Sequence, residues 1–149
     1  MLNPALIAAV IAAAVEGHAR ESKEPLPGAM PFLITPLVLH RDTRNALPSR
    51  ISTHWARWVS GHALLQAGFA PRALSLVEPV RDGLRFGLTR GDLQLTAEGA
   101  LIGGLAADAR LSQTTGDVAD IVRSAAFVGR WLTRLDRPAT AFALLGVAP

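Results

Sequence analysis

Residues 118–135 read VADIVRSAAFVGRWLTRL, and this stretch decides the fold more than any other part of the chain. Its apolar residues recur every three or four positions, so they fall along one side of a helix that turns 100° per residue. The stretch therefore predicts a long amphipathic helix that packs against a core. The apolar side consists of Val118, Ile121, Val122, Ala125, Val128, Trp131, Leu132 and Leu135.

The opposite side of this helix carries an arginine stripe, which we define as Arg123, Arg130, Arg134 and Arg137. Helical geometry places these four residues within roughly 60° of one another. One interpretation is contact with DNA phosphates or with an acidic helix of a partner protein. The other is an exposed face with few matching acids nearby. Both interpretations stay open on the sequence alone.

The N-terminal region predicts another apolar helix, which runs to about Arg20. Asn3 suits the N-cap, and Pro4 suits the first helical position because the N–H that proline lacks would be unsatisfied there anyway. The apolar run from Pro4 to Val15 spans only 12 residues, whereas a membrane-spanning helix needs about 20. A positively charged leader, as in a secretory signal, is also missing. We therefore expect a buried helix in a cytoplasmic protein without a membrane segment.

Prolines guide the prediction for the middle of the chain. After an exposed loop over residues 21–28, Pro31 and Pro36 interrupt an apolar run. This pattern predicts a buried extended segment and then a short helix that begins near Pro36, with Thr35 as its cap.

The next stretch, Ile51 to Gln66, predicts a helix with a possible break at Gly61. Pro71 then suits the start of another helix, which Pro79 divides or kinks before Gly91 ends it. Alternation over residues 92–96, a turn, and residues 100–102 predict one β-hairpin. A final short helix is expected over residues 139–145, with Gly146 after it. The fold class is thus mainly α: one small domain over residues 1–149 with a short hairpin, compatible with a winged helix.

The composition supports a single domain and limits the chemistry. The 149 residues are 50% hydrophobic, include no cysteine and carry a formal net charge of +3. Arginine provides 14 of the 15 basic residues, which suits bidentate contacts to carboxylates or phosphates but also fits a GC-rich coding sequence. Without cysteine, the chain has no disulfide and no thiolate metal site.

No motif for catalysis or for cofactor binding emerges from the sequence. The four histidines show no i, i+4 zinc spacing, and no glycine-rich segment matches a phosphate-binding loop. The serines occupy no nucleophile elbow. Glu78 and Asp82 alternate with Arg81 and Arg85, as on an ion-paired solvated face. We therefore expect no enzyme activity, no cofactor and no small-molecule substrate.

Two further regions are candidates for contact with a partner. The densest polar cluster is His40, Arg41, Asp42, Thr43 and Arg44, either an interaction or anion-binding loop or a helix-capping turn in which Asp42 pairs with a neighbouring arginine. The C-terminal segment stays apolar almost to its end, which predicts docking against the body of the protein or against a partner. We count Phe142 and Leu145 there as candidate interface residues. The three tryptophans are interpreted as core or interface anchors.

Several short motifs resemble one known family, and they occur in order along the whole chain. They are Asn3-Pro-Ala, the run from Pro36 to Pro48 (PLVLHRDTRNALP), Leu84-Arg-Phe-Gly-Leu88, Phe127-Val-Gly-Arg-Trp-Leu132, and the run from Pro138 to Val147 (PATAFALLGV). This set resembles the middle-component family of bacterial three-component ABC systems, which include Lamassu-type systems linked to defence against phages and plasmids. The resemblance implies an accessory subunit that binds an SMC- or RecN-like ABC ATPase and couples it to an effector component. It brings no catalytic residues with it.

Two functions therefore stand side by side. The first is a non-catalytic binding subunit of an ATPase complex, in which DNA is contacted, if at all, through the complex. The second is a free-standing winged-helix DNA-binding regulator, supported by the hairpin and the arginine stripe. A regulator would bind DNA alone and lose affinity steeply with salt, whereas a subunit would need its partner.

Overall fold

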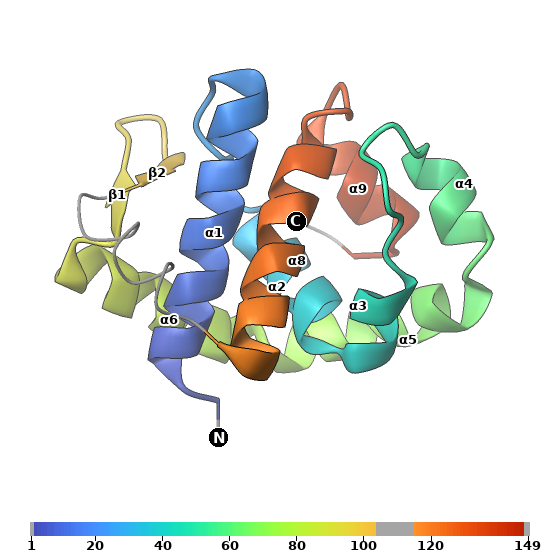
Figure 1. Cartoon of the computed structure of the whole chain (residues 1–149), viewed down its shortest axis with the longest axis horizontal. Coiled ribbons are helices and arrows are strands. Elements are labelled where there is room, and N and C mark those ends of the chain that lie inside the picture. Colours follow the sequence, from blue (N-terminus) through green and yellow to red (C-terminus); the bar gives the residue numbers. More distant parts are fainter. Residues whose placement is uncertain (1, 104–114, 148–149) are drawn as a thin grey trace.

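Helices form most of the protein in a computed structural model that describes residues 2–103 and 115–147 (Figure 1). A single short antiparallel hairpin stands at one side of the described part. The sequence prediction of a mainly α fold with one hairpin is confirmed. The elements in order are α1 (Pro4–Ser22), α2 (Pro31–Leu39), α3 (Arg41–Ala46), α4 (Trp55–Ser60), α5 (Ala63–Ser75), α6 (Val77–Arg90), β1 (Leu93–Leu95), β2 (Leu101–Gly103), α8 (Gly116–Leu132) and α9 (Pro138–Leu144).

Helix α1 begins as its sequence predicts and lies at the centre of the fold, beside α8 (Figure 1). The side chain of Asn3 accepts a hydrogen bond from the Ala5 N–H at 2.9 Å, which satisfies one of the free donors of the first turn. Apolar residues on several sides of α1 are buried, including Ile7, Val10 and Ile11. Most of the circumference of α1 is buried and only a narrow side with Leu6, Ala9 and Glu16 is partly exposed, so it is a core helix.

Two glycines let α1 and α8 approach at backbone distance. A Cβ atom on Gly17 would overlap the carbonyl oxygen of Ala126, and one on Gly129 would overlap that of Ala14. The contact is therefore reciprocal, with a glycine of each helix against an alanine of the other. Small residues at such points are what allows two helix backbones to pack this closely.

The hairpin pairs Leu93 with Gly103 and Leu95 with Leu101. Leu26, from the loop after α1, forms an isolated bridge to Leu101, with N···O distances of 2.9 and 2.7 Å between their backbones. Leu26, Leu93 and Leu101 are all buried, so the hairpin is held against the body of the protein through their side chains.

Helix α2 corrects the prediction of an extended segment before Pro36. The helix begins at Pro31 and continues through Pro36, and Thr35 lies buried inside it and does not cap it. An internal proline costs a helix about 3 kcal/mol, because one hydrogen bond is lost and its ring crowds the preceding turn. Burying each large aliphatic side chain contributes about 1.5–3 kcal/mol, so the four buried residues outweigh the proline. These are Leu33, Ile34, Leu37 and Val38.

The proline-based boundary between α5 and α6 was also wrong. Pro71 lies inside α5 and does not open a new helix, and the break falls at Leu76. Pro79 occupies the first turn of α6, where a missing N–H costs little, so it does not divide that helix. The predicted breaks at Gly61 and Gly91 are confirmed.

Helix α8 ends at Leu132, three residues before the predicted end. The chain then turns into α9, which begins at Pro138 and ends in a Schellman motif. In that motif Gly146 has φ 73°, and the N–H of Val147 donates to the carbonyl of Phe142 at 2.9 Å. Of the two predictions for the apolar C-terminal segment, docking against the body of the protein describes α9.

Candidate partner interface

The polar cluster at residues 40–44 forms a helix start rather than an extended loop. Nδ1 of His40 accepts the Thr43 N–H at 3.3 Å and lies 2.8 Å from Thr43 Oγ1, so His40 caps α3. Thr43 is buried, whereas Arg41 and Asp42 are exposed. The helix-capping alternative is therefore the one that the structure supports.

The capping interpretation expected Asp42 to pair with a neighbouring arginine, and this detail is wrong. The arginines of this cluster pair with acids of α8 instead. Arg44 Nε donates to Asp120 Oδ2 at 3.2 Å, and Arg44 Nη1 donates to the carbonyl of Val38 at 2.7 Å. The Arg44 side chain is only 7% exposed, so this ion pair lies at the edge of the core. Arg41 lies 4.0 Å from Asp117 in a more exposed pair. Together these contacts tie α3 to α8.

The arginine stripe is partly neutralised by two acids, of which Glu21 lies far away in the sequence and Asp120 lies in the same helix. Arg130 Nε and Arg134 Nη2 lie 3.3 and 3.5 Å from the two carboxylate oxygens of Glu21, at the end of α1. Arg123 pairs with Asp120 at 3.4 Å. The expectation of few matching acids is wrong for these three residues.

The stripe is also shorter than predicted. Arg134 lies beyond the last residue of α8, and Arg137 is the exposed N-cap residue of α9. The four residues therefore do not form one continuous helical face. What the structure brings together is Arg130 and Arg134, around a single carboxylate.

The three tryptophans form one buried cluster. The rings of Trp55 and Trp131 stack at 3.7 Å between centroids, and Trp58 meets both edge-on. Each indole N–H donates to a backbone carbonyl: Trp55 to Trp131, Trp58 to Ala46 and Trp131 to Thr53. Since the rings are enclosed and their donors are used, these residues act as core anchors and offer no platform for stacking bases.

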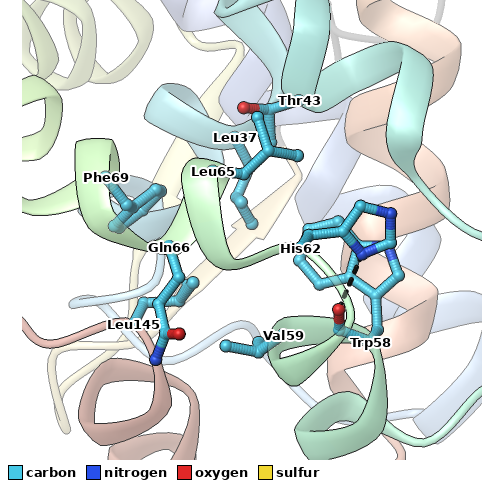
Figure 2. Close-up of a pocket in the computed structure, with 9 residues that line it drawn as sticks. All are labelled: Leu37, Thr43, Trp58, Val59, His62, Leu65, Gln66, Phe69 and Leu145. Atoms are coloured by element: carbon cyan, nitrogen blue, oxygen red, sulfur yellow. Dashed lines mark hydrogen bonds between the residues drawn. The ribbon is translucent and has the colours of Figure 1, made fainter.

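Phe142 and Leu145 are buried inside this chain. Leu145, directly after α9, belongs to the wall of a pocket formed with residues of α2, α3, α4 and α5, where His62 Nδ1 donates to the Trp58 carbonyl at 2.7 Å (Figure 2). The pocket has a volume of about 10 Å³, the space of roughly one water molecule. Phe142 and Leu145 thus complete the protein's own core, while Phe142 and Val147 also line a wider groove beside α2, α5 and α6.

Within residues 2–103 and 115–147, no three His, Asp or Glu side chains gather closely enough to hold a metal ion. None of the helices described in these ranges is both long and apolar enough to cross a bilayer.

The whole chain, residues 1–149, matches the family model described as "ABC-three component (ABC-3C) system Middle Component 3". The chain belongs to this family. No curated protein and no solved structure matches it. A Middle Component 3 protein is one part of a three-component system, so the other components of that system are its partners. The family resemblance inferred from the sequence motifs is confirmed at this level.

This Middle Component 3 protein also exposes an apolar surface that the sequence interpretation missed. Leu64 and Leu74 of α5 are 90% and 77% exposed, and Ala67 and Pro71 lie exposed between them. We call these four residues the α5 outer face. The signal was present in the sequence as apolar residues at positions 64, 67, 71 and 74, but α5 has buried apolar residues as well. Its periodicity therefore did not distinguish an inner face from an outer one.

Proposed function

We propose that this Middle Component 3 protein is a non-catalytic subunit that binds the ABC ATPase of its system and couples it to the effector component. The observation that carries the proposal is the family match over the full length of the chain. In this proposal the ATPase is of the SMC- or RecN-like type, and the complex defends the bacterial cytoplasm against phages and plasmids.

The surface chemistry supports proteins as the direct partners. Glu21 already lies against Arg130 and Arg134, and Asp120 lies against Arg123, so part of the charge of these arginines is offset. A DNA phosphate would have to compete with these carboxylates, which lowers the gain from each contact. The α5 outer face, in contrast, is apolar and has no carboxylate among its residues.

The charged candidates with exposed side chains remain proposed contacts: Arg41, Asp42, Arg123, Arg130, Arg134 and Arg137. Their exposure allows each to reach an acidic or basic partner group at the rim of an interface. Thr43, His40 and Arg44 are proposed to position this surface, because their bonds hold α3 in place.

The test is reconstitution with the two other components of the same system, each purified separately. The tagged chain is mixed with each component and with both, and the complexes are sized by light scattering. We expect a stoichiometric complex with the ATPase, and with the effector when both are present. A chain that binds neither component would contradict the proposal.

The same preparation tests the DNA-binding regulator, which the hairpin and the exposed Arg137 favour. Binding of the isolated chain to duplex DNA is measured between about 50 and 200 mM salt, because phosphate contacts weaken steeply over this range. We expect only weak binding. If the chain binds DNA tightly, loses that affinity steeply with salt and binds neither component, the DNA-binding regulator becomes the supported function and the subunit proposal is wrong.

A further inference from the structure

The α5 outer face is more apolar than a helix exposed to water usually is. Its residues at positions 64, 67, 71 and 74 are three or four apart, so they share one side of the helix. Leu64 and Leu74 stand at the two ends, with the small side chains of Ala67 and Pro71 between them. A large, small, small, large profile along about three turns forms a shallow saddle that another helix could fill.

A groove continues this surface toward α2 and α9. Leu74 belongs both to the α5 outer face and to the wall of this groove, which has a volume of about 480 Å³. Most of its other lining is apolar: Phe32 from α2, Ala70 from α5, Val77 from α6, and Val147 after α9. The face and the groove are therefore one continuous apolar surface, larger than the scattered single residues that need no explanation.

Pro71 adds a polar feature to the same face. Because proline has no N–H, the carbonyl of Ala67 does not receive the hydrogen bond that residue 71 would otherwise donate. Ala67 and Pro71 are both exposed, so this missing helical bond lies on the solvent side of α5.

The charges around the face indicate the kind of partner. Between Asp42 and Glu78 the sequence contains no acidic residue and four arginines, at positions 44, 50, 57 and 72. Arg44 is bound to Asp120, but Arg50 and Arg57 are exposed, and Arg81 lines the groove beside Glu78, with which it pairs. Among the helices packed against α5, α2 has no charged residue, α4 has Arg57 and no acid, and α6 has three arginines against Glu78 and Asp82. The surroundings of α5 therefore have an excess of positive charge, which complements an acidic partner. A second copy of the chain would bring the same positive charge and would be repelled.

We propose that the α5 outer face and the adjoining groove bind an amphipathic helix of another component of the system, with an apolar side flanked by acidic residues. This inference rests on the proposed function and names the surface through which the chain would bind its partner. It is a helix-in-groove contact, in which apolar anchors at helical spacing provide affinity and the acidic flanks fix the orientation. Leu64 and Leu74 are the anchors on this chain, and Arg57 is the nearest exposed charge in the preceding helix.

The test uses the full-length chain with the double substitution Leu64→Glu and Leu74→Glu. The matched control is Leu95→Glu, which places the same charge on another exposed leucine, 59% exposed on β1. Dissociation constants for the separately purified ATPase and effector are measured by calorimetry. We expect the double variant to weaken binding of one component at least about thirty-fold, the loss typical of central interface residues, and the control to change it less than about threefold.

Two further variants keep the test decisive. If the double glutamate variant fails to fold, Leu64→Gln with Leu74→Gln removes the apolar anchors without adding charge, and we expect the same direction of effect. Arg57→Glu should weaken the same interaction and reduce its dependence on salt, because one attraction to the acidic flank is lost.

The possible results separate this inference from the proposed function. A wild-type chain that binds neither component overturns both. A wild-type chain that binds, with both double variants binding as tightly, overturns only the α5 site. A wild-type dimer that the double variant converts to a monomer, with component binding unchanged, assigns the face to a second copy of the chain and overturns the acidic partner helix.

Discussion

Helices α8 and α5 both carry apolar faces, but only α8 covers its face almost entirely within this chain. Val122, Ala125, Val128 and Trp131 of α8 are buried. In α5 only Phe69 and Ala73 are buried, while both ends of the outer face lie in solvent. An apolar pattern therefore shows that a face favours burial, and the structure shows how much of that burial the chain itself provides. The following predictions test this contrast, from the largest expected effect to the smallest.

Replacing Trp131 by alanine should have the largest effect. The residue is fully buried and its ring stacks on Trp55, so Trp131→Ala leaves a large cavity. We expect the free energy of unfolding to fall by about 3–5 kcal/mol. Urea unfolding followed by tryptophan fluorescence and by circular dichroism measures the change. A loss below about 1 kcal/mol would mean that the α8 face is not the core that the structure describes.

Adding one methyl group at the contact between α1 and α8 should be the next largest effect. Gly129→Ala gains helix propensity, but its Cβ would overlap the backbone of Ala14, so the two helices must move apart. We expect a net loss of about 1–3 kcal/mol in the free energy of unfolding.

The matched control is Gly68→Ala in α5. There the new Cβ would meet only the flexible end of the Arg72 side chain. This variant should be neutral or slightly more stable, because alanine favours the helix by up to about 1 kcal/mol. An equal loss in the free energy of unfolding for Gly129→Ala and Gly68→Ala would show that the close contact between α1 and α8 is not the cause of the destabilisation.

The ion pair between α3 and α8 should contribute less than the core contacts. Asp120→Ala leaves the nearly buried guanidinium of Arg44 without its carboxylate. Because Asp120 itself is 49% exposed, solvent screens part of the loss, and we expect about 1 kcal/mol. In contrast, Glu78→Ala removes an exposed pair within α6 and should change the free energy by less than about 0.5 kcal/mol. Thermal unfolding of the two variants side by side measures the difference.

The α5 outer face should contribute least to the stability of the isolated chain. Leu64→Gln and Leu74→Gln keep a similar helix propensity and remove side chains that are already exposed, so each should change the free energy of unfolding by less than about 0.5 kcal/mol. Chemical denaturation of the single variants provides the measurement. A loss of 2 kcal/mol or more, on the order of a buried aliphatic residue, would place this face in the core of the chain.

The sequence predicted those elements whose signals are local. Asn3 and Pro4 mark the start of α1, the glycines at positions 61 and 91 mark two breaks, and alternation marks the hairpin. Each of these depends on residues only a few positions apart, so no knowledge of the tertiary fold is needed. The family resemblance likewise depended on short motifs in order.

The sequence misled where distant contacts override local preference. Pro36 and Pro71 each break a helix in isolation, but surrounding side chains hold both helices together across them. The acidic partner of Arg130 and Arg134 was hidden for the same reason. Glu21 lies more than one hundred residues from Arg130 and Arg134, so no periodicity within residues 118–135 could reveal it.

The central position of α1 has a consequence for synthesis on the ribosome. This helix is translated before α8, which covers one side of it and begins more than ninety residues later. At a translation rate of about 5–20 residues per second, the interval is on the order of 5–20 s. During that time this largely buried helix lacks its main packing partner. We therefore expect the nascent chain to depend on chaperones until α8 emerges, and the finished protein to fold around a helix that was made well before its main packing partner.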